Sequence, residues 1–356
     1  MPLNDCKRNT HPVCGQTEAT EALATTAREA VCSITNMLIA EKRCRRNVGY
    51  KNSTCRFAMM NMSRCNELCN ELINGTYKPT HGEKHEVFEP KYRVVTSSKY
   101  RDRVPQSSFV LNYFYPTVVP HLIDTNCACL KGKGVDKARG ALKDMLREAD
   151  ADDYCLKVDM KSYFASIDHD ILYQELFEFI TDEWARAFFI QTTENASTRI
   201  GLDLGSEVYQ LSATSFLNKL DHKLRRGKYI RYQDDLIFVG TKEECRKALC
   251  EVRKEAERLH LKISEKKTYI QSIKRPISFL GFTFLRHRAG KVTVKRLPEK
   301  LRKERRKLKR MKEKGIPIER VEAHYESVRA CLKKGARADL AKMDNYVKQL
   351  FYEGDK

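Results

Sequence analysis

Two adjacent carboxylates between two apolar runs are the feature that most constrains how this chain can fold. Residues 229–239 have the sequence YIRYQDDLIFV, and the apolar residues on either side of Asp234 and Asp235 predict the two strands of a β-hairpin with the acids at its tip. Because two like charges side by side repel each other, such a pair at the end of buried strands favours a bound cation. A plain turn is the alternative, since adjacent acidic residues are common in hairpin loops.

A third carboxylate, Asp159, ends another strand-like segment. In residues 154–159 apolar and polar side chains alternate, which is typical of a strand with one buried face. If this strand lies beside the hairpin, Asp159, Asp234 and Asp235 converge and can hold two Mg²⁺ ions about 3.5–4 Å apart, an arrangement suited to in-line phosphoryl transfer. Mn²⁺ is a substitute that the same oxygen ligands accept.

The charge of the chain predicts a polyanionic partner. Its 356 residues include 67 Lys and Arg against 47 Asp and Glu, a formal net charge of +20, which favours nucleic acid over a membrane surface. No stretch approaches the roughly 18 apolar residues of a spanning helix, and the N-terminal residues are polar. We therefore expect no membrane segment, no secretory signal and a cytoplasmic location.

The 13 cysteines contain no C-x-x-C pair, which favours reduced structural thiols. A metal knuckle built from Cys127 and Cys129 with distant partners is the alternative.

The order of the predicted elements indicates an α+β chain. Residues from about 17 to 75 show helical spacing, strands are expected around residues 87–95, and a helix is expected from its N-cap at Asp168 to about Phe179. Residues 295–314 contain twelve basic and three acidic residues, and we favour a helix that contacts phosphates over a merely solvated face. The run after Gly315 predicts a small terminal helical bundle.

Residues 232–235, Tyr-Gln-Asp-Asp, resemble the Tyr-x-Asp-Asp signature of the reverse transcriptase family. Residues 157–169, KVDMKSYFASIDH, are similar to the first palm motif of that family, which places its metal-binding Asp at 159 and its aromatic steric gate against ribose at Phe164. From the residues alone, Phe164 would be an ordinary core side chain. The resemblance extends from about residue 45 to 350, with the motifs in the family's order.

The resemblance implies a right-hand polymerase fold. It also implies an enzyme that extends a primer along a template RNA with dNTPs and binds the resulting RNA/DNA hybrid. The implied parts are an N-terminal helical extension at 1–65, fingers at 66–150, a palm with a fingers insertion at 151–285, and a basic helical thumb at 286–356.

Other segments resemble family motifs that contact nucleotide, template or primer. Residues 91–93 and 101–106 resemble fingers motifs, 127–134 a Gly-Lys-Gly loop, and 279–282 the primer grip; for single arginines, salt bridges with Asp102 or Glu89 are the alternative. Residues 261–268 resemble a motif whose lysine protonates the departing pyrophosphate, and Lys267 is the candidate, against a lysine on a solvated edge. The implied nucleotide-binding residues are Arg93, Arg101, Phe164, Leu204, Gly205, Gln210 and Tyr232. The implied primer- and template-binding residues are Lys91, Arg103, Lys131, Lys133, Phe279, Leu280, Gly281, Lys303, Arg306 and Lys307.

Residues 201–210 and 217–222 most resemble reverse transcriptases of diversity-generating retroelements. Those enzymes have an apolar residue, here Leu204, where many relatives have a Gln that restrains the incoming nucleotide. The resemblance implies error-prone copying opposite template adenines, with a structured RNA and a small basic helical accessory oligomer as partners. Residues 205–210, GSEVYQ, depart from the family's usual Gly-Asn-x-x-Ser-Gln pattern, and Pro105 replaces a usual aliphatic residue in the fingers. An antiphage-defence or retron enzyme, or an RNA-binding maturase-like scaffold, therefore remain alternatives.

Overall fold

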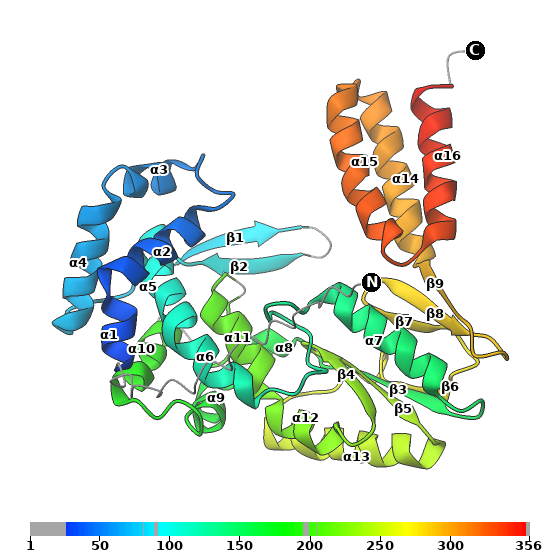
Figure 1. The fold of residues 1–356 in the computed structure, drawn as a ribbon, viewed down its shortest axis with the longest axis horizontal. Coiled ribbons are helices and arrows are strands. Elements are labelled where there is room, and N and C mark those ends of the chain that lie inside the picture. The colour runs from blue at the N-terminus through cyan, green and yellow to red at the C-terminus, as the bar shows by residue number, and fades with distance from the viewer. Residues whose placement is uncertain (1–25, 81, 89–91, 195–198, 204, 354–356) are drawn as a thin grey trace, which may run out of the picture.

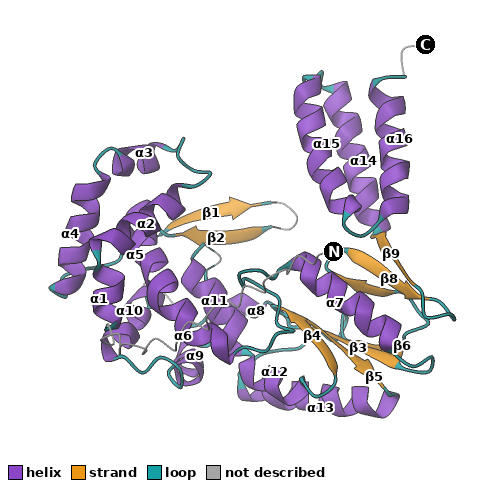
Figure 2. Cartoon of the chain, in the orientation of Figure 1, coloured by secondary structure: helices purple, strands orange, loops and turns teal. Residues whose placement is uncertain are grey.

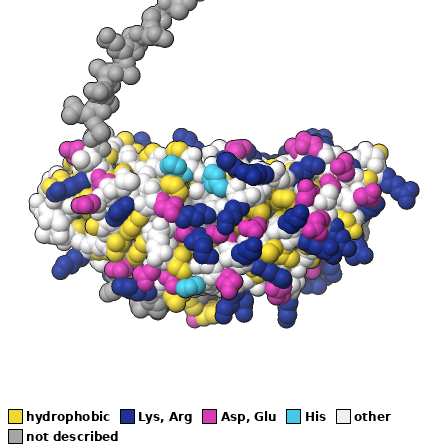
Figure 3. Space-filling view, turned by 90° about the horizontal axis from the view of Figure 1, so that it is seen from below, with side chains coloured by type: hydrophobic (Ala, Val, Ile, Leu, Met, Phe, Trp, Pro, Cys, Tyr) yellow, Lys and Arg dark blue, Asp and Glu magenta, His cyan; other side chains and the backbone are white. Residues whose placement is uncertain are grey.

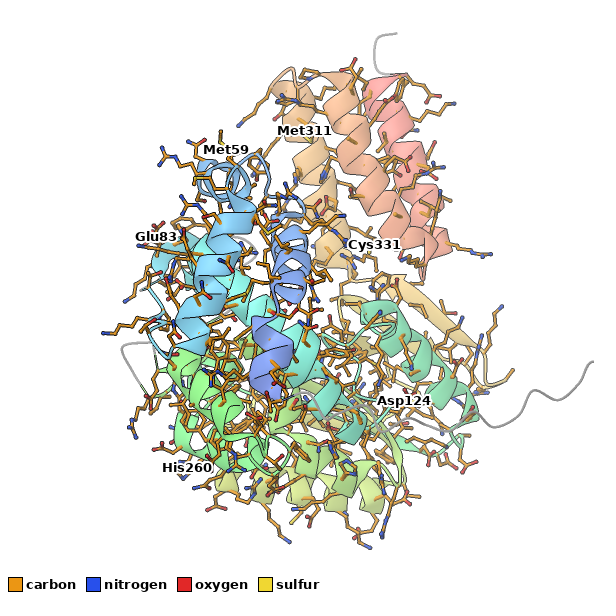
Figure 4. The ribbon with its side chains drawn as sticks, turned by 60° about the vertical axis from the view of Figure 1, so that its left-hand side comes forward. Met59, Glu83, Asp124, His260, Met311 and Cys331 are labelled. Atoms are coloured by element: carbon orange, nitrogen blue, oxygen red, sulfur yellow. The ribbon has the colours of Figure 1, made fainter. Side chains whose placement is uncertain are left out.

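The computed structural model describes residues 26–353 except 81, 89–91, 195–198 and 204. A mainly helical N-terminal region and a C-terminal helical bundle form two arms, and antiparallel sheets lie between their bases (Figure 1). In a turned view, Met59 and Met311 lie on these two arms, and both are on the same side of the sheets (Figure 4). The expected α+β architecture is confirmed.

The N-terminal arm is built from short helices around one apolar core. Helix α1 begins with a capping box, in which Thr26 and Glu29 satisfy each other's backbone N–H groups. The helices are α1 (Ala27–Cys32), α2 (Ile34–Arg45), α3 (Asn52–Ala58), α4 (Asn61–Ile73) and α5 (Tyr100–Phe109). The helical prediction for residues 17–75 is therefore confirmed where the structure describes the chain.

A two-stranded hairpin, β1 (Glu83–Val87) and β2 (Arg93–Ser97), extends from this arm toward the centre of the molecule (Figure 1). The two strands overlap the two ends of the expected strand region at 87–95. After α5, which contains Pro105, the chain continues through a π-helix η1 (Val110–Phe114), α6 (Tyr115–Val118) and a 3₁₀-helix η2 (Val119–His121).

The main sheet has four antiparallel strands in the order β4-β5-β3-β6. Alternate residues of β5 enter different cores: Leu236 and Phe238 pack in the core shared with the N-terminal arm, whereas Ile237 and Val239 pack in the core shared with the C-terminal elements. Both faces of the sheet are therefore buried. The strands are β3 (Tyr154–Asp159), β4 (Lys228–Tyr232), β5 (Asp235–Gly240) and β6 (Tyr269–Ser272). The strand predicted at 154–159 and the hairpin predicted at 229–239 are confirmed.

Helices cover both faces of this sheet. Helix α7 (Val135–Glu148) packs on one face, and α13 (Lys242–Arg258) on the other. Asp168 caps α9 as predicted, although that helix ends at Leu176 rather than near 179. The remaining helices are α8 (Tyr163–Ser166), α9 (His169–Leu176), α10 (Glu183–Thr193), α11 (Glu207–Phe216) and α12 (Asn218–Leu224).

The surface formed by α12 and α13 carries charges of both signs. Basic and acidic side chains are interspersed on this side of the molecule (Figure 3). Arg258 is paired with both Glu175 and Glu255, whose side chains are almost fully buried. The pair with Glu175 joins α9 to α13.

A second, three-stranded sheet connects the main sheet to the C-terminal bundle (Figure 2). Its strands are β7 (Ile277–Phe279), β8 (Phe282–Arg286) and β9 (Val292–Arg296), and the bundle helices are α14 (Pro298–Glu313), α15 (Ile318–Lys333) and α16 (Arg337–Phe351). The expected terminal bundle is confirmed. The basic helix begins at Pro298 rather than at 295, because Lys295 and Arg296 complete strand β9.

The expected divisions at 65 and 285 fall inside continuous elements, α4 and β8, and α7 packs with the sheet although it precedes residue 150.

Among the described residues, no helix is both long and apolar enough to cross a membrane. Each cysteine in the described ranges is a free thiol.

Candidate active site

Strand pairing brings the predicted carboxylates together. In the register of β3 and β5, Asp159 lies directly opposite Asp235. Asp234 occupies the turn between β4 and β5, and its carbonyl oxygen accepts a hydrogen bond from the backbone N–H of Met160, 3.3 Å away. The predicted convergence of the three acids at one edge of the sheet is therefore observed in the backbone.

Asp159 is held by Lys267, the residue proposed from the resemblance. The Nζ atom of Lys267 lies 2.9 and 2.7 Å from the two carboxylate oxygens of Asp159. The lysine side chain is 54% exposed, whereas that of Asp159 is only 15% exposed. The ammonium group therefore approaches the acid from the solvent side and can leave without disturbing the core.

Asp235 lies in a more enclosed environment. Burial raises the pKa of its carboxyl group to about 6, against the lowering effect of Lys157, and the negative charges of Asp234 and Asp159 raise it further. Lys157 Nζ donates to the Ser278 carbonyl oxygen at 2.7 Å and lies 3.4 Å from Asp235 Oδ1, within ion-pair distance. Within the described residues, that oxygen is buried and has no hydrogen-bond donor.

The carboxylates lie in a cleft of about 1340 Å³. Its lining includes residues from the β1–β2 hairpin, the start of α8, the turn between β4 and β5, and the segment before Gly281. The predicted site residues among the lining are Asp159, Phe164, Tyr232, Asp234, Asp235, Lys267 and Leu280. Phe164 is half-buried on α8, so one part of its ring contacts the core and another faces the cleft.

The segment before α11 approaches the hairpin closely. A Cβ atom on Gly205 would lie 2.8 Å from the carbonyl oxygen of Thr96, closer than real Cβ contacts, so this approach requires glycine. Ser206 caps α11 and donates a hydrogen bond to Gln106 at 2.9 Å. Leu204 lies outside the described residues. Gln210 does not line the cleft; its side-chain oxygen lies 3.9 Å from the Cys129 thiol.

Several predicted nucleic-acid contacts have intramolecular partners. Arg101 is paired with Glu71 and Asp102, so the salt-bridge alternative describes this arginine. Lys133 Nζ donates to three backbone carbonyls of residues 123–126, which braces that loop. The other positions are as follows: Arg103 is half-buried on α5, Lys131 is exposed, Lys91 lies outside the described residues, and the side chain of Arg93 is also outside them.

The turn between β7 and β8 has only part of the geometry expected of a primer grip, in which a primer strand approaches the backbone closely. Leu280 and Gly281 have positive φ values of 45° and 81°, and Leu280 lines the cleft. Phe279, however, is buried in the core, and the open side of Gly281 faces the guanidinium of Arg296.

On α14 only Leu308 is buried. The three predicted phosphate contacts, Lys303, Arg306 and Lys307, have exposed side chains.

The donor set fits a divalent metal ion, although the carboxylates are paired with lysines here. In the described ranges, no three His, Cys, Asp or Glu side chains are gathered as a ready-made metal cluster. The oxygen donors are nevertheless those that Mg²⁺ prefers, and Asp235 has a buried oxygen without a hydrogen-bond donor. The exposed Lys267 is a cation that a metal ion can replace at Asp159.

Two residues at this site were not found from the sequence. Lys157 contacts Asp235, and Arg231 contacts the turn that contains Asp234. A basic residue within an apolar strand was the available signal, because such a residue needs a buried partner. The sequence did not show which partner it has.

An antiparallel sheet with three acids at its edge, set between a helical arm and a basic helical bundle, is the fold of a right-hand polymerase. The family described as "Reverse transcriptase (RNA-dependent DNA polymerase)" matches residues 82–284, more than half of the chain. The chain belongs to this reverse transcriptase family, whose members generally use divalent metal ions.

A solved structure of apo telomerase from Candida tropicalis resembles this chain with a TM-score of 0.44 and 11% sequence identity. The match covers 62% of this chain and 49% of the telomerase chain, so this chain spans about half the length of that protein. No curated protein matches the sequence.

Proposed function

We propose that this protein is an RNA-directed DNA polymerase that extends a primer along an RNA template with dNTPs. The observation that supports it most directly is the register of β3 and β5, which sets Asp159 opposite Asp235 at the cleft, with Asp234 in the adjoining turn. A protein that only binds RNA has no need for three converging negative charges, which cost free energy unless a cation compensates them.

In this proposal Asp159, Asp234 and Asp235 are the metal ligands. Two Mg²⁺ ions bound there would lower the pKa of the primer 3′-hydroxyl and stabilise the leaving pyrophosphate. The chain itself contributes position and protons. Lys267 is near enough to the acids and exposed enough to donate a proton to pyrophosphate, and Phe164 narrows the cleft where a ribose 2′-hydroxyl would lie.

In this proposal the fingers, palm and thumb begin and end at the boundaries of helices and strands. The N-terminal helices through α6, with the β1–β2 hairpin, would act as fingers, and the main sheet with α7 to α13 as the palm. The bundle α14–α16 would act as the thumb. The exposed basic residues of α14 support contact with the phosphates of an RNA/DNA hybrid.

We further propose, from the resemblance at residues 201–222, that copying is error-prone opposite template adenines and that the enzyme serves a diversity-generating retroelement in the cytoplasm. The close backbone approach of Gly205 to β2 supports a role for this segment beside the incoming nucleotide. A structured RNA and a small basic accessory oligomer would be its partners. Substitution Leu204→Gln should then lower misincorporation opposite adenine.

The experiment is extension of a primer on an RNA template by purified protein with Mg²⁺, followed by sequencing of the DNA. The parent should make DNA, and an Asp234→Asn, Asp235→Asn variant should make none. Asp152→Asn is the control, because Asp152 is an exposed acid, paired with Lys274, that lies just before β3 at the far end from the cleft.

Errors concentrated opposite adenine would support the retroelement role, and accurate DNA would favour a defence or retron enzyme. Absence of product from the parent, with structured RNA and candidate accessory protein supplied, would support the RNA-binding scaffold instead.

A further inference from the structure

A buried ion pair lies directly beneath the turn that contains Asp234. Arg231 of β4 and Asp221 of α12 are both fully buried, with relative exposures of 0%. Arg231 Nε and Nη2 donate to the two carboxylate oxygens of Asp221 at 2.7 and 2.5 Å. Asp221 also accepts hydrogen bonds from the Tyr229 hydroxyl at 2.7 Å and from the Asn126 amide at 3.3 Å.

The remaining donors of Arg231 hold the turn itself. Nη1 donates to the carbonyl oxygen of Gln233 at 3.0 Å, and Nη2 also donates to the carbonyl oxygen of Thr214 at 2.7 Å. Gln233 lies between Tyr232 and Asp234, so its carbonyl is part of the peptide bond that links it to Asp234. The guanidinium group of Arg231 therefore joins α11, α12 and the turn that contains Asp234.

The turn needs such support because Gln233 has a left-handed backbone, with φ of 55°. Residues other than glycine adopt this conformation at a cost, and it persists only where the surroundings enforce it. The Gln233 side chain is also held, since its Nε2 donates to the Thr214 hydroxyl at 2.9 Å. Arg231 therefore holds the backbone of Gln233, and Thr214 holds its side chain.

Stability alone does not account for the pair. Replacing a buried ion pair with apolar residues of similar volume is often neutral or stabilising, so an apolar pair could join β4 to α12 equally well. An apolar pair could not donate to the Gln233 carbonyl. The property specific to Arg231 is this donation, and Asp221 orients the guanidinium that makes it.

We propose that Arg231 and Asp221 are positioning residues that hold the Gln233 turn in its left-handed conformation and thereby place Asp234 and Asp235 opposite Asp159. This inference rests on the proposed polymerase function. It assigns the two residues no contact with substrate or metal; they act through the backbone of the turn.

The test compares four proteins: the parent, Arg231→Leu, the double variant Arg231→Leu with Asp221→Leu, and Arg286→Leu. Arg286 is the matched control because its guanidinium also donates to two carbonyls, those of Leu146 and Ala149, but lies outside the cleft lining. Each protein is examined by thermal unfolding, by Mn²⁺ affinity without nucleic acid, and by kcat and KM for dNTP on a primed RNA template.

The single variant should unfold at a lower temperature than the parent, because it leaves the Asp221 charge buried and unpaired. The double variant should remain folded, yet bind Mn²⁺ about 10-fold more weakly and lose about 10- to 100-fold in kcat, with KM for dNTP nearly unchanged. Arg286→Leu should affect unfolding alone. If the double leucine variant does not fold, Arg231→Met with Asp221→Asn gives the same comparison, because the asparagine can still accept from the Tyr229 hydroxyl while methionine has no donor for the Gln233 carbonyl.

A folded double variant with the parent's Mn²⁺ affinity and kcat would overturn the inference while leaving the polymerase function intact. A parent that binds Mn²⁺ but makes no DNA would overturn the proposed function, and the Mn²⁺ affinities of the variants would still decide the role of Arg231. A parent that binds no Mn²⁺ would overturn both.

Discussion

Removing the Lys267 side chain should raise the apparent affinity for Mg²⁺ and lower the maximal rate. In the structure its ammonium group is bound to both carboxylate oxygens of Asp159, at 2.9 and 2.7 Å. A metal ion that uses Asp159 as a ligand must displace this ammonium first. The substitution Lys267→Met therefore removes a competitor for the metal and, in our proposal, the proton donor to pyrophosphate.

The size of the metal effect follows from the exposure of the pair. Because the Lys267 side chain is 54% exposed, its ion pair with Asp159 is comparable to surface pairs, which contribute about 0.5–1 kcal/mol. That free energy corresponds to about a 2- to 5-fold fall in the Mg²⁺ concentration that gives half-maximal rate. Loss of a general acid should lower the maximal rate much more, by about 100-fold.

The assay is primer extension over a Mg²⁺ titration, with Mn²⁺ binding to the free protein as a second measurement. Lys266→Met is the control, since Lys266 is an exposed neighbour and has no ion pair among the described residues. It should reproduce any general effect of lost positive charge. A half-saturating Mg²⁺ concentration that stays constant or rises in Lys267→Met, or that falls equally in Lys266→Met, would refute competition at Asp159.

Gly205→Ala would place a Cβ atom 2.8 Å from the Thr96 carbonyl oxygen, so the β1–β2 hairpin should shift and KM for dNTP should rise in steady-state extension. Phe164→Ala should increase rNTP incorporation relative to dNTP by about 10-fold or more, measured as the ratio of kcat/KM values. Lys307→Gln should reduce the slope of log affinity against log salt for a primed template by about 0.7–0.9, if Lys307 contacts one phosphate. Burial raises the pKa of Glu255, but ion pairs with basic neighbours lower it more, and the net pKa lies below its ordinary value of 4.5. The stabilisation from Glu255 is thus present above pH 4.5 and lost as the pH falls through the lowered pKa; Glu255→Gln should flatten that decline in the urea midpoint.

The parts of the fold that could be predicted from the sequence are those set by local patterns. Period-two alternation predicted β3 to the residue, and apolar runs around Asp234 and Asp235 predicted the hairpin. Asp168 was recognisable as an N-cap because its short carboxylate can accept from the first turn of the helix. The meeting of Asp159 with Asp235 followed from these, since strand ends that carry acids converge when the strands pair.

Contacts between distant segments could not be predicted in this way. Lys267 and Asp159 are separated by 108 residues, and their pairing depends on where the chain returns after α13. The start of the basic helix was misplaced because charge density does not distinguish a helix from the strand before it, and Pro298 marks the change. Motif positions in the sequence likewise do not show that α7 packs on the sheet.

The two lysines at the carboxylates have different physical situations, and this difference explains how the site can be stable before a metal ion binds. Three converging acids repel one another, so the folded chain needs positive charge near them. Lys157 is 14% exposed and fixed by the Ser278 carbonyl, so its charge stays at Asp235. Lys267 is largely exposed and contacts only the solvent side of Asp159, so its charge can be exchanged. The first lysine suits a permanent compensation of the buried acid, and the second a temporary one. In our proposal a metal ion replaces Lys267 at Asp159, and its ammonium group then becomes available to the leaving pyrophosphate.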